Sequence, residues 1–192
     1  MKTSKYPVLY ARVQQGINAF DGEYTYTKFS MRAEKNFKIK GLGRPGFFVD
    51  AGYIDGQVPQ HKLNASTGTF KYNNFMLASQ NVFETMQPYE FFSSEYVHLH
   101  LRHSFGTLLL KWKKFAPEFV LTSSAGWGRL SYQGLHGGIP FKTMEKGYFE
   151  SGMLVNNLIK VNNSAFGVGS FYRYGPYQLP KASDNFSVKM SL

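Results

Sequence analysis

The 192-residue chain contains no cysteine, which excludes a disulfide framework and any metal site built on thiolates. It also lacks a run of roughly 18 consecutive apolar residues, so no membrane-spanning helix is predicted. Residues 1–7 carry positive charge but no apolar core, so we do not expect them to act as a secretory signal peptide. The lack of a long apolar run does not exclude a transmembrane β-barrel, because each strand of such a barrel is only half apolar. The lack of a signal peptide argues against an exported protein, unless the signal has been removed or the chain is the C-terminal part of a longer precursor.

Basic residues outnumber acidic ones by 22 to 12, which gives a formal net charge of +10. Such a charge suits nucleic acid, an anionic membrane surface or an acidic partner. The basic residues are scattered along the chain and no nucleic-acid-binding motif accompanies them, so we expect no nucleic-acid partner. The length suits a single domain spanning 1–192.

The most informative pattern is a strict alternation at 95–105. Side chains on a strand change face at every residue, so Val97, Leu99 and Leu101 would share one face. The opposite face would carry polar side chains, namely Tyr96, His98, His100 and Arg102. This opposition of a lipid-like face and a hydrogen-bonding face is typical of a barrel with lipid outside and water inside.

Similar alternation recurs along the chain, and convincing helical periodicity is nearly absent. The expected strands lie near 6–16, 24–37, 47–53, 91–105, 119–127, 148–161, 166–174 and 186–192. We therefore predict an all-β fold, an antiparallel transmembrane β-barrel of about eight strands that is either complete or part of a larger barrel.

The connections between these strands fall into two sets. The set expected at one end is fairly short, near 40–45, 106–116 and 162–163. The set at the other end lies near 18–23, 57–90, 133–146 and 175–182 and includes the long irregular segment 57–90. Loops of that length are usually functional, so we expect this segment to be the main contact surface.

Several motifs, taken in order, resemble the C-terminal barrel of a Bacteroidota outer-membrane family. They include Lys5-Tyr-Pro-Val-Leu9, Gly46-Phe-Phe-Val-Asp-Ala-Gly52, Phe83-Glu-Thr-Met86, His103-Ser-Phe-Gly-Thr-Leu-Leu-Leu110, Gly147-Tyr-Phe-Glu-Ser-Gly152 and Asp184-Asn-Phe-Ser-Val-Lys-Met190. Longer members of that family carry an N-terminal carboxypeptidase-regulatory-like β-sandwich, and their activity is uncharacterised. The resemblance implies a location in the cell outer membrane. It fits a chain that begins midway through a longer protein, and an independent small barrel is the alternative.

The barrel hypothesis assigns positions to particular side chains. Ten polar residues are expected to face the interior: Arg12, Lys28, Arg32, Glu34, Asp50, His98, His100, Arg102, Arg173 and Lys189. Trp112 and Trp127 are expected to anchor the protein at the membrane interface, where tryptophan is enriched. Around Trp112, the apolar and basic stretch 107–115 is either an ordinary connection or a binding site for an anionic lipid head group.

The sequence gives less support to the hypotheses of a catalytic site and of a metal site. His98 and His100 would lie about 7 Å apart on one face, but no nearby acidic or sulfur ligand completes a site, so neither metal nor cofactor is expected. A hydrolase could draw on Ser93, Ser94, Glu95, His98 and Ser104, yet no Gly-x-Ser-x-Gly motif occurs. We therefore assign no catalytic residue.

The sequence favours a structural, assembly or partner-binding role in the outer membrane. The expected partners are outer-membrane lipid and other outer-membrane or periplasmic proteins. One alternative is a soluble lipocalin-like binder, in which the apolar rows would surround a small ligand. A second alternative is an outer-membrane lipid-modifying hydrolase.

Overall fold

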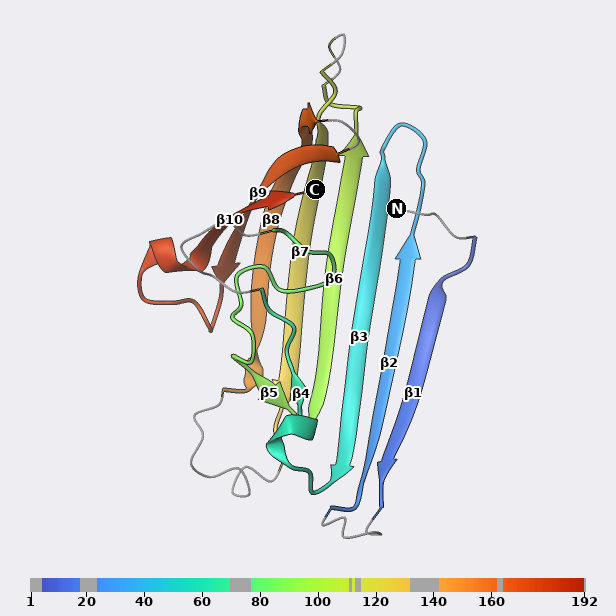
Figure 1. Cartoon of the computed structure of the whole chain (residues 1–192), viewed down its shortest axis with the longest axis vertical. Helices are drawn as coiled ribbons and strands as arrows, with labels where there is room; N and C mark the ends of the chain where they lie inside the picture. Colours follow the sequence, from blue (N-terminus) through green and yellow to red (C-terminus); the bar gives the residue numbers. More distant parts are fainter. Residues whose placement is uncertain are drawn as a thin grey trace.

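The computed structural model describes residues 5–17, 24–69, 77–110, 112, 115–131, 142–161 and 164–191. Eight strands form one antiparallel sheet in the order β1-β2-β3-β6-β7-β8-β9-β10 (Figure 1). Their bounds are β1 Val8–Gly16, β2 Tyr26–Asn36, β3 Arg44–Gly56, β6 Glu95–Gly106, β7 Glu118–Arg129, β8 Met144–Val161, β9 Ser164–Tyr174 and β10 Phe186–Ser191. The all-β prediction and the count of about eight strands are confirmed.

The predicted closed barrel is not found. β1 and β10 are the two edges of the sheet, and the described residues contain no pairing between them. At Met190 the outer edge of β10 instead contacts another part of the chain, because Leu77 forms a parallel bridge with Met190 and the Ala78 amide donates to the Met190 carbonyl at 2.6 Å. The sheet is therefore an open arc, and β1 could not pair with β10 at Met190 without displacing this contact.

The strands alternate in direction, so their connections separate into two ends as expected. The β2–β3, β6–β7 and β8–β9 connections lie at one end, which we call the short-connection end and which is uppermost in Figure 1. The start of β1 and the end of β10 point to the same end, because the number of strands is even. The remaining connections lie at the opposite end.

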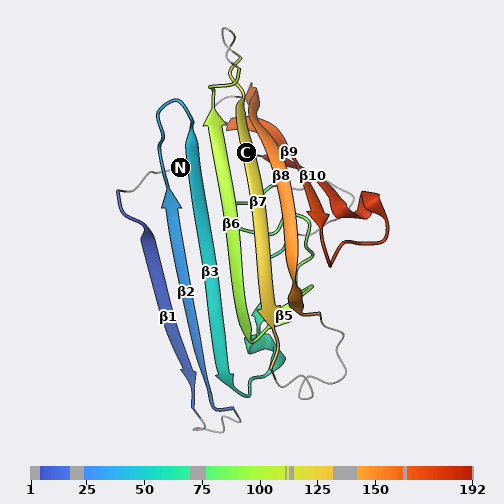
Figure 2. The same ribbon diagram turned by 180° about the vertical axis from the view of Figure 1, so that it is seen from behind.

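The chain between β3 and β6 folds back over one face of the sheet. We call its described parts, 57–69 and 77–94, the covering segment; it contains the 3₁₀ turn η1 (Gln60–Lys62) and the paired short strands β4 (Asn64–Ala65) and β5 (Phe92–Ser93). Figure 1 shows this segment in front of the sheet, whereas the view from behind in Figure 2 shows the strands uncovered. A second 3₁₀ turn, η3 (Ala182–Asn185), leads into β10.

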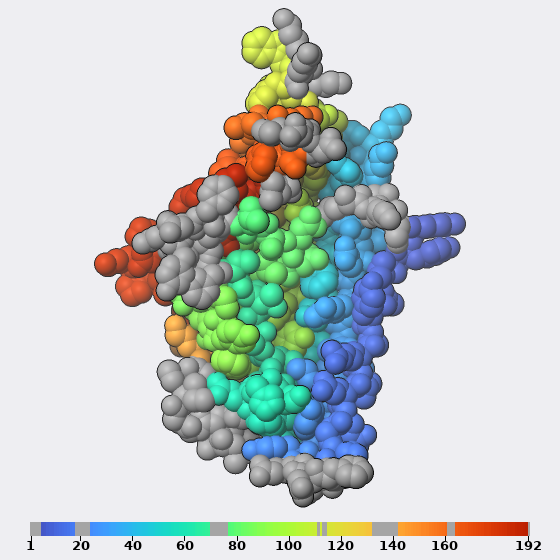
Figure 3. All heavy atoms as spheres, viewed as in Figure 1, coloured from blue at the N-terminus to red at the C-terminus, as the bar shows by residue number. Residues whose placement is uncertain are grey.

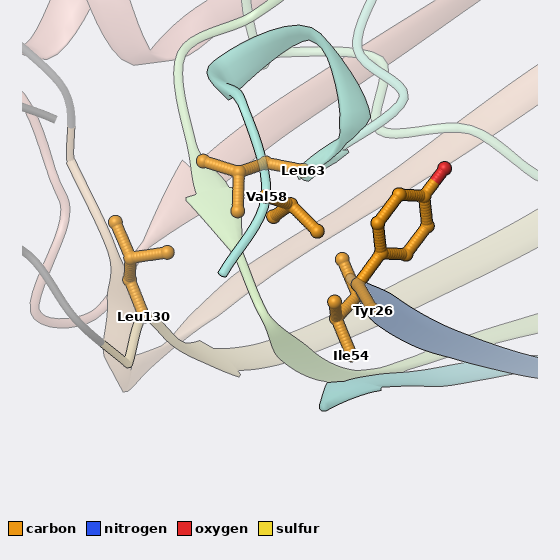
Figure 4. Close-up of a cluster of buried hydrophobic side chains, with 5 residues drawn as sticks. All are labelled: Tyr26, Ile54, Val58, Leu63 and Leu130. Atoms are coloured by element: carbon orange, nitrogen blue, oxygen red, sulfur yellow. The ribbon is translucent and has the colours of Figure 1, made fainter. Parts of the chain in front are cut away.

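Buried apolar side chains gather between the covering segment and the sheet. One cluster joins Val58 and Leu63 of the segment to Tyr26, Ile54 and Leu130 (Figure 4). A second joins Phe83, Met86 and Phe91 of the segment to Met144 and Tyr148 of β8. The apolar core therefore lies on one side of the sheet only. No helix among the described residues is long and apolar enough to span a membrane.

Candidate functional site

The two faces of the sheet have opposite chemistry and opposite exposure. The uncovered face, which we call the apolar face, presents large apolar side chains that are 37–68% exposed. They include Leu9, Val13, Phe29, Met31, Tyr53, Val97, Leu101, Leu121, Trp127, Met153, Val168, Tyr172, Tyr174, Phe186 and Val188. In a protein surrounded by water such side chains are normally the buried ones.

The covered face, which we call the polar face, carries the ten residues predicted to face an interior. The strand registers place all ten on this face. His98, His100, Arg173 and Lys189 are buried beneath the covering segment, whereas Arg12 and Arg32 are exposed. Figure 3 shows the segment in green over the middle of this face, with the blue atoms of β1 and β2 visible beside it.

Lys189 of β10 makes the most deeply buried ion pair with the covering segment. Its Nζ lies 2.7 Å from Oε2 of Glu84, and the two side chains are 0% and 5% exposed. Nζ also donates to the Thr69 hydroxyl, and Oε1 of Glu84 accepts from the Ser79 amide at 2.6 Å. Every charge in this cluster is paired, which burial of ionic groups requires.

Arg173 of β9 makes the second buried ion pair. Its Nη1 and Nη2 donate to the two carboxylate oxygens of Glu90 at 3.3 and 2.9 Å. The guanidinium also lies over the ring of Tyr148, 4.7 Å from the ring centroid. This bidentate, stacked geometry is specific to arginine and fixes the position of Glu90 on the sheet.

Glu150 of β8 binds the backbone of the same segment. Its carboxylate accepts from the amides of Glu84 and Thr85 at 2.7 and 2.9 Å, and from the Thr85 hydroxyl at 2.6 Å. These bonds satisfy two backbone donors that have left water. Three polar strand residues, from β8, β9 and β10, thus hold the covering segment between residues 84 and 90.

The two histidines of β6 pack against the segment. Phe83 is completely buried, and its ring centroid lies 5.2 Å from that of His98 and 4.8 Å from that of His100. His100 Nδ1 lies 2.9 Å from the Ser124 hydroxyl, whereas His98 Nε2 has no hydrogen-bond partner among the described residues. No group of three or more metal-ligating residues occurs in the described part of the chain.

The residues considered for a hydrolase are not brought together. Ser104 donates to Glu118, Ser94 donates to the Arg129 carbonyl, and Glu95 pairs with Arg129. The structure does bring together one histidine–serine pair that the sequence did not indicate, the hydrogen-bonded His100 and Ser124. It borders a cavity of about 30 Å³, which has room for water but for no organic substrate.

The two tryptophans predicted as anchors lie at opposite ends of the sheet. Trp112 belongs to the β6–β7 connection and is 71% exposed. Trp127 lies near the far end of β7 on the apolar face, where its indole N–H donates to the Glu145 carbonyl at 3.0 Å. Such a separation along the strands is compatible with two interfaces, although their role as anchors remains a prediction.

Sequence reasoning also missed the acidic partners Glu84, Glu90 and Glu150. The sequence offered one indication of such partners. Arg173 and Lys189 lie on strand faces that would be buried, where a cation requires a counter-charge. Nothing in an alternating pattern identifies which distant carboxylate supplies it.

These features define a class, an all-β protein with an open antiparallel sheet, an exposed apolar face and a covered polar face. A family model for the C-terminal domain of DUF5686, a family of unknown function, matches residues 1–135. The chain belongs to this family, which agrees with the resemblance to a C-terminal domain of uncharacterised activity. No curated protein and no solved structure matches the chain.

Proposed function

We propose that this chain is the membrane-embedded arc of an outer-membrane β-barrel, with a structural, assembly or partner-binding role. The main observation behind the proposal is the direction in which the side chains of the two faces point. The apolar side chains point away from the protein, while the polar side chains point to the side of the sheet on which the covering segment lies. This inversion is expected where lipid replaces water as the outer solvent.

The edges of the sheet favour an arc of a larger barrel rather than a complete small barrel. The outer edge of β1 has no strand partner among the described residues. Unpaired backbone groups cost several kcal/mol each in a bilayer, so an open edge does not occur in lipid. In the membrane, β1 therefore requires a further strand, supplied by the rest of a longer polypeptide or by another protein.

The covering segment supports a role other than bulk transport. It fills the polar face of β6–β10 with buried aromatic side chains and paired charges, so that half offers no open channel. The segment reaches Tyr26 of β2 and Ile54 of β3. Elsewhere over β1–β3 the face has a hollow of about 510 Å³ beside Arg12, Arg32 and Glu34. A partner or an additional part of the barrel interior would contact the protein there.

The placement of the faces disfavours a soluble lipocalin-like binder. Such a protein would direct its apolar rows toward an enclosed ligand cavity. Here Val97, Leu121 and Met153 point outward instead. The lipid-modifying hydrolase has less support, because the candidate serines, histidines and acids are not assembled.

The test is detergent dependence. We expect the purified chain to fold only with micelles or lipid and to show heat-modifiable gel migration. A chain that is monomeric and folded in plain buffer would refute the membrane proposal. Bilayer reconstitution of Val97→Ser would serve as a control, because a small polar substitution at one outward position should not abolish insertion.

A further inference from the structure

Two connections meet at the short-connection end of the sheet. The turn 37–43 joins β2 to β3, and the connection 107–117 joins β6 to β7. The ring Nε2 of His103 donates to the Leu42 carbonyl at 2.9 Å, which fixes the turn against β6. Between them lies a hollow of about 570 Å³, whose lining includes residues 38–41, Arg44 and Leu108.

The hollow is positively charged. Lys38, Lys40 and Arg44 contribute three cations to its lining and Glu118 one carboxylate. Arg44 lies 3.6 Å from that carboxylate, whereas the exposed Lys38 and Lys40 have no ion-pair partner among the described residues. Two cations are therefore available to an external anion.

The two connections at this end also expose apolar side chains, and two of them, Ile39 and Leu108, line the hollow together with the cations. The exposed apolar side chains are Phe37, Ile39, Leu42, Leu108, Leu109, Leu110, Trp112 and Phe115. An exposed apolar patch of this kind indicates a surface that contacts another molecule. A highly charged acidic protein or a nucleic acid would satisfy the cations but would leave these side chains in water.

We infer that this hollow binds the phosphate of an anionic phospholipid, with Lys38 and Lys40 as its ligands and the surrounding apolar side chains against the acyl chains. The inference rests on the proposed membrane function, which it extends by naming a lipid class and a site. Cations next to the bilayer attract anionic head groups, and tryptophan is enriched at that depth. The short connections of outer-membrane barrels face the periplasm, so the lipid would belong to the periplasmic leaflet.

The test uses the whole chain in detergent micelles doped with phosphatidylglycerol or phosphatidylcholine, and native mass spectrometry counts the lipids that remain bound. We expect the unmodified chain to retain more phosphatidylglycerol than phosphatidylcholine, so this comparison requires no variant. The double substitution Lys38→Gln and Lys40→Gln should weaken retention by roughly 30-fold, from about 1 kcal/mol per cation. The matched control is Lys146→Gln with Lys181→Gln, two exposed lysines at the opposite end.

Three outcomes would overturn the inference. They are equal retention of both lipids, unchanged retention in the Lys38/Lys40 variant, and an equal loss in the control variant. A fourth outcome separates a lipid site from a free-anion site. We expect the phospholipid to stay bound in millimolar inorganic phosphate, and its complete displacement would overturn the assignment of a lipid site. Failure of the membrane proposal would appear separately, as folding without detergent.

Discussion

Removal of the Lys189 ammonium should release the covering segment from the sheet. In Lys189→Met the apolar stem is retained, but Glu84 is left buried without its cation. Breaking a buried pair by removing one partner costs about 3–5 kcal/mol, because the remaining charge stays out of water. The cost should appear as local opening of residues 79–85, since Glu84 is the contact of that stretch with β10.

Hydrogen exchange measures this opening directly. The amides of Glu84 and Thr85 donate to Glu150, so they are protected only while the segment is docked. A loss of about 3 kcal/mol raises their exchange rates at least about 100-fold, since each 1.4 kcal/mol is a factor of ten. Lys146→Met, at an exposed lysine with no ion pair among the described residues, is the control and should leave both rates unchanged.

A double variant tests whether the effect arises from the uncompensated charge. Glu84→Gln added to Lys189→Met removes the charge and retains an oxygen that can accept from the Ser79 amide. We expect it to restore at least half of the lost protection. Exchange rates in Lys189→Met within threefold of the wild type, or a double variant more open than the single one, would show that the Lys189–Glu84 pair does not hold the segment.

Three other substitutions test separate parts of the structure. Arg173→Met should destabilise docking of the covering segment by about 3–5 kcal/mol in the same exchange experiment. Lys142 also pairs with Glu90, but its side chain is 60% exposed, so Lys142→Met should change the docking free energy by less than about 1 kcal/mol. Equal effects of the two substitutions would contradict the role of burial. Phe83→Ala should cost about 3–5 kcal/mol in denaturant unfolding, because the ring is completely buried between the segment and β6; a cost under about 1 kcal/mol would show that the ring is dispensable. Leu121→Arg should destabilise the protein by about 2–4 kcal/mol when it is unfolded from lipid vesicles, if this exposed side chain lies near the bilayer midplane; a change within about 0.5 kcal/mol is the result for an ordinary water-exposed surface.

The strands were predictable because alternation is a local property. The pattern expected at 95–105 corresponds to Glu95–Gly106, and that expected at 119–127 corresponds to Glu118–Arg129. The division of the connections between two ends followed from strand order alone. Each of these predictions needs only neighbouring residues and the reversal of direction between adjacent strands.

Closure and the covering segment were not predictable in the same way. Whether an eight-stranded sheet closes depends on what occupies its edges, and the contact of Leu77 with Met190 has no local signature. The pairing of Glu84 with Lys189 joins residues 105 positions apart. The irregular composition of 57–90 identified a long connection but gave no indication that Phe83 would pack against the histidines of β6.

The proposed contact of the apolar face with lipid and of the polar face with water is directly measurable, because the chain contains no cysteine. Single cysteines at Phe29, Ser30, Met31 and Arg32 of β2, a strand with little cover, would each carry a spin label in reconstituted vesicles. We expect high accessibility to oxygen at Phe29 and Met31, and high accessibility to a water-soluble nickel chelate at Ser30 and Arg32. Equal access of the nickel chelate to all four positions, or the reverse alternation, would contradict the proposed contacts.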